Sequence, residues 1–268
     1  MKKLKEKPLL ISHKSNLQFE DIRSTFGLNT NQKIIIAGPC AIYNHNSFVE
    51  TVAFLKTHNI KLIRAATFKP RTSPYSFQGL GHTANKIIKE TKRKYKVFCV
   101  SEIMDPRELK NMLGYADVLQ IGARNMQNFS LLKEIGGCNK PILLKRGLAA
   151  TLEEFMLAAE YLAVSGSRSI ILCERGLRTP QTHVRNLLDI AAIPVLKKET
   201  KLPVIVDLSH SLGRTDVICE IARGVIAAGA DGIMVEVFKE PHKALSDATQ
   251  QITFNEFTNL MNSIGNSR

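Results

Sequence analysis

The stretch from residue 62 to residue 81 reads Leu-Ile-Arg-Ala-Ala-Thr-Phe-Lys-Pro-Arg-Thr-Ser-Pro-Tyr-Ser-Phe-Gln-Gly-Leu-Gly. It begins as an apolar strand that ends at Arg64 and continues as a loop. The loop contains two cations, Lys69 and Arg71, followed by Thr72, and two prolines, Pro70 and Pro74. Each proline fixes φ and restricts the residue before it, so the cations lie on a stiffened backbone. Such a loop can hold an anion at low entropic cost. A solvated basic loop with turn prolines is the alternative.

Outward from this stretch, short apolar runs alternate with segments long enough to be helices. The runs that we predict to be strands are 34–38, 61–64, 97–101, 118–122, 142–145, 169–173, 204–207 and 232–236. Their continuous apolar character indicates burial on both faces, as in parallel sheets. The pattern predicts an α/β fold, a closed (β/α)8 TIM barrel, which typically needs about 250 residues. We assign residues 31–268 to the catalytic barrel and residues 1–30 to a short N-terminal extension.

Local signals also predict where helices begin. Thr151 followed three residues later by Glu154 is typical of a capping box. Asp105 before a proline predicts a second helix start, and Ser246 or Asp247 predicts the start of the last helix.

Composition limits the class of protein. An apolar content of 44% and a charged content of 23% are typical of folded soluble proteins and argue against disorder. The five cysteines include no C-x-x-C pair, so they do not resemble a disulfide framework, and we expect a cytoplasmic protein. No segment approaches a membrane span, and we expect no membrane partner.

The formal net charge of +13 fits either a nucleic-acid surface or a site for anionic small molecules. Many of the arginines stand singly where apolar strands end, whereas a nucleic-acid surface would cluster them along one helix. We therefore favour the small-molecule site and expect no nucleic-acid partner. A non-catalytic binding protein remains the rival interpretation, and it predicts salt-sensitive binding of RNA or DNA.

Five cations stand at or just after predicted strand ends: Arg64, Lys69, Arg124, Lys145 and Arg175. In a (β/α)8 barrel these ends meet at one face, where catalytic groups lie. So many like charges around one opening are costly unless an anion neutralises them. Because arginine forks and a lysine point charge suit phosphate and carboxylate, the set predicts a site for a phosphorylated acid. Arg71 and Thr72 could hold a second phosphate.

A thiol, an imidazole and two carboxylates form a second group of candidates: Cys40, His210, Glu236 and Asp247. These donors suit a borderline divalent metal, and their mixed softness leaves Mn, Fe, Co and Zn open. No two of them form a local ligand motif. A buried filler cysteine and an ordinary loop histidine are therefore the alternatives.

Several segments that contain these residues closely resemble the type I 3-deoxy-D-arabino-heptulosonate 7-phosphate (DAHP) synthases, in particular the Iβ subfamily. The similar segments are 37–40, 69–81, 121–128, 144–147, 173–179, 206–211, 235–237 and 244–248. The resemblance implies a TIM barrel and a metal-dependent transferase. This enzyme class condenses phosphoenolpyruvate with erythrose 4-phosphate and water to give DAHP and phosphate, the first step of the shikimate pathway to chorismate and the aromatic amino acids.

The resemblance also assigns roles to residues. It implies one divalent metal ion on Cys40, His210, Glu236 and Asp247. It implies phosphoenolpyruvate on Arg64, Lys69, Arg124, Lys145 and Arg175, and erythrose 4-phosphate on Pro70, Arg71 and Thr72. Lys69, Cys40 and His210 would be catalytic: the metal polarises the aldehyde, and Lys69 or a metal-linked water supplies a proton. Glu102 could help to position the water that attacks later.

Two features set limits on this resemblance. Ala65-Ala66 stands where relatives have Gly-Gly, and Phe238 stands where relatives often have His. We expect a homo-oligomer, either a dimer or a tetramer, and the resemblance leaves room for a chorismate mutase partner. The nearest rival is 3-deoxy-D-manno-octulosonate 8-phosphate synthase, which uses a pentose phosphate, and the Lys69–Thr72 sequence disfavours it.

Overall fold

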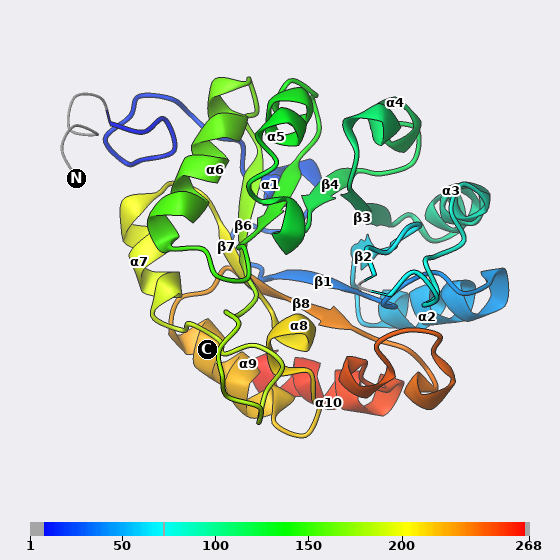
Figure 1. Ribbon diagram of the computed structural model, residues 1–268. Helices are drawn as coiled ribbons and strands as arrows, with labels where there is room; N and C mark the ends of the chain where they lie inside the picture. Colours follow the sequence, from blue (N-terminus) through cyan, green and yellow to red (C-terminus); the bar gives the residue numbers. More distant parts are fainter. Residues whose placement is uncertain (1–7, 72, 266–268) are drawn as a thin grey trace.

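The computed structural model describes residues 8–71 and 73–265. Eight parallel strands close into a barrel in the order of the chain, with β1 paired to β8 (Figure 1). The strands are β1 (Ile34–Gly38), β2 (Leu62–Arg64), β3 (Phe98–Ile103), β4 (Val118–Ile121), β5 (Ile142–Lys145), β6 (Ile170–Glu174), β7 (Val204–Asp207) and β8 (Gly232–Glu236). Every predicted strand is present, so the predicted (β/α)8 barrel is confirmed.

Helices surround the barrel and connect its strands (Figure 1). They are α1 (Ile22–Thr25), α2 (His45–Thr57), α3 (Thr83–Tyr95), α4 (Leu109–Met112), α5 (Phe129–Gly136), α6 (Leu152–Val164), α7 (Ala192–Glu199), α8 (Leu208–Leu212), α9 (Ile218–Ala227) and α10 (Phe254–Gly265). Short 3-10 turns are η1 (Pro106–Glu108), η2 (Ala123–Asn125), η3 (Pro241–Lys243) and η4 (Ala248–Gln250). No helix within the described ranges is long and apolar enough to cross a bilayer.

The three predicted helix starts can be compared with the structure. Asp105 caps the 3-10 turn η1, which α4 follows, and its carboxylate accepts from the backbone N–H of Arg107. The capping box between Thr151 and Glu154 at the start of α6 is present. The prediction of a last helix starting near Asp247 is wrong, because α10 begins at Phe254. Asp247 has a left-handed backbone, with φ of 48°, and its carboxylate binds cations instead of capping a helix. A capping box between Thr253 and Glu256 precedes α10.

Apolar side chains fill the barrel in two layers. The outer layer lies between the strands and the helices, and it includes Leu55, Leu132 and Phe155. The inner layer runs through the barrel and continues into α1 and the residues after it, where Phe26 contacts Phe98 at 4.6 Å between ring centroids. One end of the barrel is thereby closed. The boundary that we placed at residue 30 stays a prediction, because the described residues before it pack directly on the barrel.

Candidate active site

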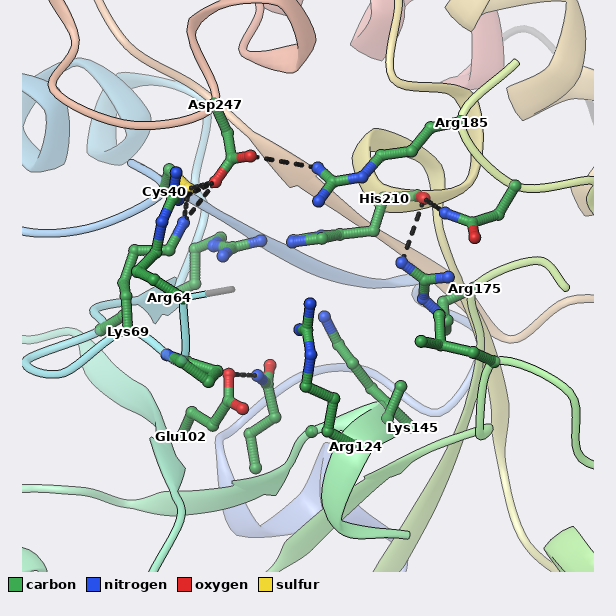
Figure 2. Close-up of a pocket in the computed structure, with 18 of the residues that line it drawn as sticks. Cys40, Arg64, Lys69, Glu102, Arg124, Lys145, Arg175, Arg185, His210 and Asp247 are labelled. Atoms are coloured by element: carbon green, nitrogen blue, oxygen red, sulfur yellow. Dashed lines mark hydrogen bonds and ion pairs between the residues drawn. The ribbon is translucent and has the colours of Figure 1, made fainter. Parts of the chain in front are cut away.

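The other end of the barrel, where the strands have their carboxyl ends, contains a cavity of about 380 Å³. Its lining includes the predicted residues Cys40, Arg64, Lys69, Pro70, Arg71, Arg124, Lys145, Arg175, His210 and Asp247. Figure 2 shows Arg64, Arg124 and Lys145 directed toward one central space. Glu236 is fully buried and contacts Arg64 and His210. Thr72 lies outside the described residues. The barrel thus brings together side chains that are up to 207 positions apart in the chain.

Backbone hydrogen bonds close the loop between β2 and α3. Lys69 N–H donates to the carbonyl of Gln78, and Gly81 N–H donates to the carbonyl of Thr67, both at 2.9 Å. Gly79 has φ of 98°, and a Cβ at this position would lie 2.2 Å from the carbonyl oxygen of Thr67. Only glycine fits such a close backbone approach at positive φ. The loop is therefore held by its ends as well as by its prolines.

Internal carboxylates neutralise three of the five cations. Arg64 lies 2.8 Å from Glu236, and Lys69 lies 2.6 Å from Asp247. Lys145 contacts Asp207, which is fully buried at the end of β7. Within residues 8–71 and 73–265, no carboxylate lies within ion-pair distance of Arg124 or Arg175. These two arginines therefore carry charge that an anionic ligand can neutralise.

Arg175 is almost fully buried, and its burial lowers the pKa of its guanidinium. Its Nη2 donates to the backbone carbonyl of His210 at 3.3 Å, which fixes its direction. A buried guanidinium without a carboxylate partner is costly to keep charged. A bound phosphate or carboxylate would remove that cost.

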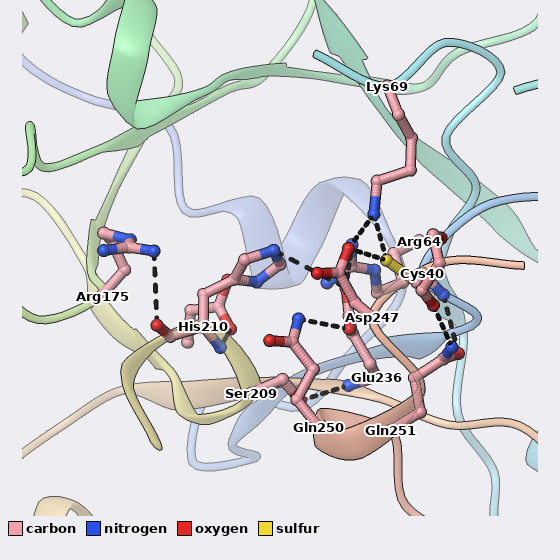
Figure 3. Close-up of polar contacts among 12 residues, drawn as sticks. Cys40, Arg64, Lys69, Arg175, Ser209, His210, Glu236, Asp247, Gln250 and Gln251 are labelled. Carbon is pink, nitrogen blue, oxygen red and sulfur yellow. Dashed lines mark hydrogen bonds and ion pairs between the residues drawn. The ribbon is translucent and has the colours of Figure 1, made fainter. Parts of the chain in front are cut away.

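The four predicted metal ligands form two pairs (Figure 3). Cys40 Sγ lies 3.2 Å from Asp247 Oδ2, and His210 Nε2 lies 3.7 Å from Glu236 Oε1. The amine of Lys69 contacts both the thiol and the Asp247 carboxylate. Among the described residues, no group of three or more His, Cys, Asp and Glu side chains has the arrangement of a formed metal site. The four donors are close together but not converged on one point.

The protonation of these groups depends on burial and on their neighbours. Burial raises the pKa of the Cys40 thiol well above its ordinary value, and Glu236 raises it further, against the opposing charges of Lys69 and Arg64. Burial opposes ionisation of Asp247 as well, but Lys69, Cys40 and Arg185 together outweigh it and hold the pKa of Asp247 far below its ordinary value. In this structure the pair therefore consists of a thiol and a carboxylate.

The donor set nevertheless fits a divalent cation chemically. Burial lowers the pKa of His210, which favours the neutral imidazole that metals bind. Asp207 Oδ2 lies 2.9 Å from the other ring nitrogen, Nδ1, although outside hydrogen-bond geometry. Glu236 Oε1 is buried and faces Arg64 Nη2 at 2.8 Å, although this ion pair is outside hydrogen-bond geometry. A buried carboxylate oxygen beside a neutral imidazole supplies two ligands of the kinds that a divalent cation binds.

Sequence reasoning missed several residues of this site. Arg185, in the connection between β6 and α7, lies 3.1 Å from Asp247, so that carboxylate binds three cations, the other two being Lys69 and Arg71. Asn186 donates to the carbonyl of His210 at 2.7 Å. The buried residues Gln250 and Gln251 also join the network. None of these stands at a strand end or in a local motif, so no sequence signal singled them out.

Comparisons with known proteins agree with this geometry. Residues 18–267 match the model of the DAHP synthetase I family. A phospho-2-dehydro-3-deoxyheptonate aldolase of Thermotoga maritima is 50% identical over 227 residues, which cover 85% of this chain and 67% of the relative. A crystal structure of a phospho-2-dehydro-3-deoxyheptonate aldolase (DAHP synthase) from that organism has a TM-score of 0.85 and 46% identity, covering 89% of this chain and 69% of that one.

A second group of relatives is more distant. A 2-dehydro-3-deoxyphosphooctonate aldolase of Desulfosudis oleivorans is 26% identical over 249 residues, which cover 86% of this chain and 88% of the relative. The family match spans nearly the whole barrel, and its higher identities are with heptonate enzymes. The chain therefore belongs to the DAHP synthetase I family.

Proposed function

We propose that this protein is a DAHP synthase, a transferase that condenses phosphoenolpyruvate, erythrose 4-phosphate and water into DAHP and inorganic phosphate. The observation that carries the proposal is the cavity at the carboxyl end of the barrel. Its lining combines several cations with a thiol, an imidazole and a carboxylate that could bind a metal ion. The family match supports the same activity. We place the enzyme at the first step of the shikimate pathway, in the cytoplasm and in the Iβ subfamily.

We assign the phosphorylated acid to the cations around the central space: Arg64, Lys69, Arg124, Lys145 and Arg175. Arg124 and Arg175, which have no carboxylate partner among the described residues, would bind its phosphate and carboxylate directly. Fixed cations stabilise charge that moves during a reaction without having to reorganise, which is where such sites gain most of their rate.

We assign the aldehyde substrate to the loop after β2, through Pro70, Arg71 and Thr72. Arg71 Nη1 lies 3.0 Å from Asp247 Oδ2, at the side of the cavity where Lys69 also contacts that carboxylate. A phosphate bound at Arg71 would leave the aldehyde within reach of the Lys69 amine. Holding both reactants in this way converts an encounter into an oriented, nearly unimolecular step.

We propose the following sequence of steps for these groups. C3 of phosphoenolpyruvate forms a bond to the aldehyde carbon, and the aldehyde oxygen takes a proton from Lys69. Water adds to C2 of the resulting cation and gives up one proton, which restores Lys69. The bond from C2 to the bridging oxygen then breaks, inorganic phosphate leaves with that oxygen and the remaining hydroxyl proton, and C2 becomes the ketone carbon of DAHP. Glu102, whose carboxylate accepts from the amide of Gln120 at 3.0 Å on the cavity wall, would position that water.

We propose one divalent ion, Mn, Fe, Co or Zn, on Cys40, His210, Glu236 and Asp247. When bound, it would supply Lewis-acid polarisation of the aldehyde oxygen. Cys40 and His210 would act as ligands, and both are held in place from the backbone side by neighbouring residues. We further propose a homo-oligomer, a dimer or a tetramer, which could associate with a chorismate mutase.

The test is phosphate release from purified protein, with phosphoenolpyruvate and either erythrose 4-phosphate or arabinose 5-phosphate as cosubstrate. We expect turnover with the four-carbon sugar and little with the five-carbon one. We also expect chelation to abolish turnover and added Mn²⁺ or Co²⁺ to restore it. Preference for arabinose 5-phosphate would instead support the octulosonate reaction of the more distant relatives, and turnover that resists chelation would remove the metal.

A further inference from the structure

Two consecutive glutamines, Gln250 and Gln251, lie beneath the candidate metal ligands and are only 2% and 1% exposed. The amide of each makes hydrogen bonds through both its oxygen and its nitrogen. Gln250 bonds to the Glu236 carboxylate, and Gln251 bonds to the backbone of Cys40 (Figure 3). We propose that Gln250 and Gln251 are positioning residues that hold the two pairs in register for one divalent ion. This inference rests on the proposed function.

Gln250 orients Glu236. Its Oε1 accepts a hydrogen bond from the guanidinium of Arg185, and this contact fixes which end of the amide faces the barrel. Its Nε2 therefore donates to Glu236 Oε2, at 2.7 Å. The other carboxylate oxygen, Oε1, forms an ion pair with Arg64 Nη2 at 2.8 Å and lies 3.7 Å from His210 Nε2. Gln250 thus occupies one oxygen of Glu236 and leaves the other on the side of Arg64 and His210.

Gln251 links the second pair through the backbone. Its Oε1 accepts from the backbone N–H of Cys40 at 3.0 Å, and its Nε2 donates to the carbonyl of Ser246 at 3.0 Å. Ser246 directly precedes Asp247, so one amide connects the chain at Cys40 to the chain at Asp247. The thiol and carboxylate of this pair are 3.2 Å apart. The hydroxyl of Tyr43 accepts a further bond from Nε2 at 3.1 Å, which fixes the direction of the amide.

The two glutamines are adjacent, so a single segment ties both pairs together. Residues that orient metal ligands in this way commonly contribute about 10–100-fold in metal affinity or activity. A purely structural role, in which the amides only satisfy buried groups, predicts lower stability but unchanged metal affinity in the folded protein. Metal affinity therefore separates the two roles.

The experiment compares Gln250→Met and Gln251→Met with the wild type. Each substitution keeps the length of the side chain and removes the amide. The matched control is Gln120→Met, because Gln120 is also a buried glutamine (6% exposed), lines the same cavity and bonds to Glu102 rather than to a proposed ligand. We would measure Co²⁺ and Mn²⁺ affinity by competition with a chelator, the thiolate-to-cobalt charge-transfer band, and Tm.

We expect metal affinity to fall about 10–100-fold in both variants and to stay near the wild-type value in Gln120→Met. Gln251→Met should also shift the cobalt band, since this residue holds the backbone of Cys40. If Gln250→Met does not fold, Gln250→Asn replaces it, because the shorter amide cannot reach both Arg185 and Glu236. Wild-type affinity in the folded variants, or an equal loss in Gln120→Met, would overturn the inference. Failure of the wild type to bind either metal would instead overturn the proposed function.

Discussion

The two ends of the barrel differ in what they bury: one end buries apolar side chains, and the other buries charged and polar ones. At the closed end, Ile22, Phe26 and Leu28 continue the inner apolar layer. At the open end, Arg64, His210 and Glu236 each have a buried polar atom without a hydrogen-bond partner among the described residues. An unsatisfied buried group costs about 1–3 kcal/mol, so the open end is less stable than its packing would allow. Bound ligands can satisfy these groups and so remove the cost. Apolar packing at the closed end compensates for it in the free protein.

The strongest test of this difference is Lys69→Met. If Lys69 supplies a proton, kcat/KM should fall by about 10²–10⁴-fold, the usual contribution of a general acid. The free energy of unfolding should change by only about 1 kcal/mol, because methionine fills the same buried space and Asp247 keeps its partners Arg71 and Arg185. Phosphate release and urea unfolding measure the two effects. Lys86→Met, at an exposed lysine of α3, is the control and should change neither.

At the closed end the expected effects are reversed. Phe26→Ala removes a side chain that is 4% exposed and whose ring contacts Phe98 at a tilt of 53°, and it should cost about 3–5 kcal/mol of unfolding free energy. Turnover per folded molecule should stay unchanged, since the cavity is at the other end. Urea unfolding combined with activity at saturating substrate tests this. A fall in kcat that parallels the loss of stability would contradict the separation of the two ends.

Residues on the strands could be predicted from the sequence, whereas residues on the connections between them could not. The strands were predictable because continuous apolar runs such as 142–145 are characteristic of buried parallel strands, and Arg64 and Lys145 could be placed at one face because strand ends converge. Arg185 and Gln250 could not be predicted, because their position depends on how connections fold over the barrel. Nor could the pairing of Lys69 with Asp247 be predicted, since an internal ion pair between loops leaves no periodic signal.

A smaller effect is expected where the open end is tightly packed. A Cβ at Gly122 would lie 2.1 Å from Oε1 of Glu102, so Gly122→Ala must displace that carboxylate. Because the end of a glutamate side chain can move, the unfolding free energy should fall by less than about 1 kcal/mol. A misplaced water-positioning group should lower kcat by up to about 100-fold. Gly265→Ala, in the open space at the end of α10, is the matched control. Unchanged kcat in Gly122→Ala would remove Glu102 from the reaction.

The smallest effect is expected at the tip of the loop after β2. Tyr75 is 97% exposed, and its backbone N–H donates to the hydroxyl of Ser73 at 3.3 Å, a bond that does not depend on the ring. Tyr75→Ala should change the unfolding free energy by less than about 0.5 kcal/mol, as exposed substitutions usually do. It should leave kcat/KM near the wild-type value, because the loop owes its rigidity to its prolines and to the bonds of Lys69 and Gly81. If kcat/KM instead fell with stability unchanged, the ring would have to contact the substrate or another copy of the chain. The active part of the open end would then extend to the exposed tip of this loop.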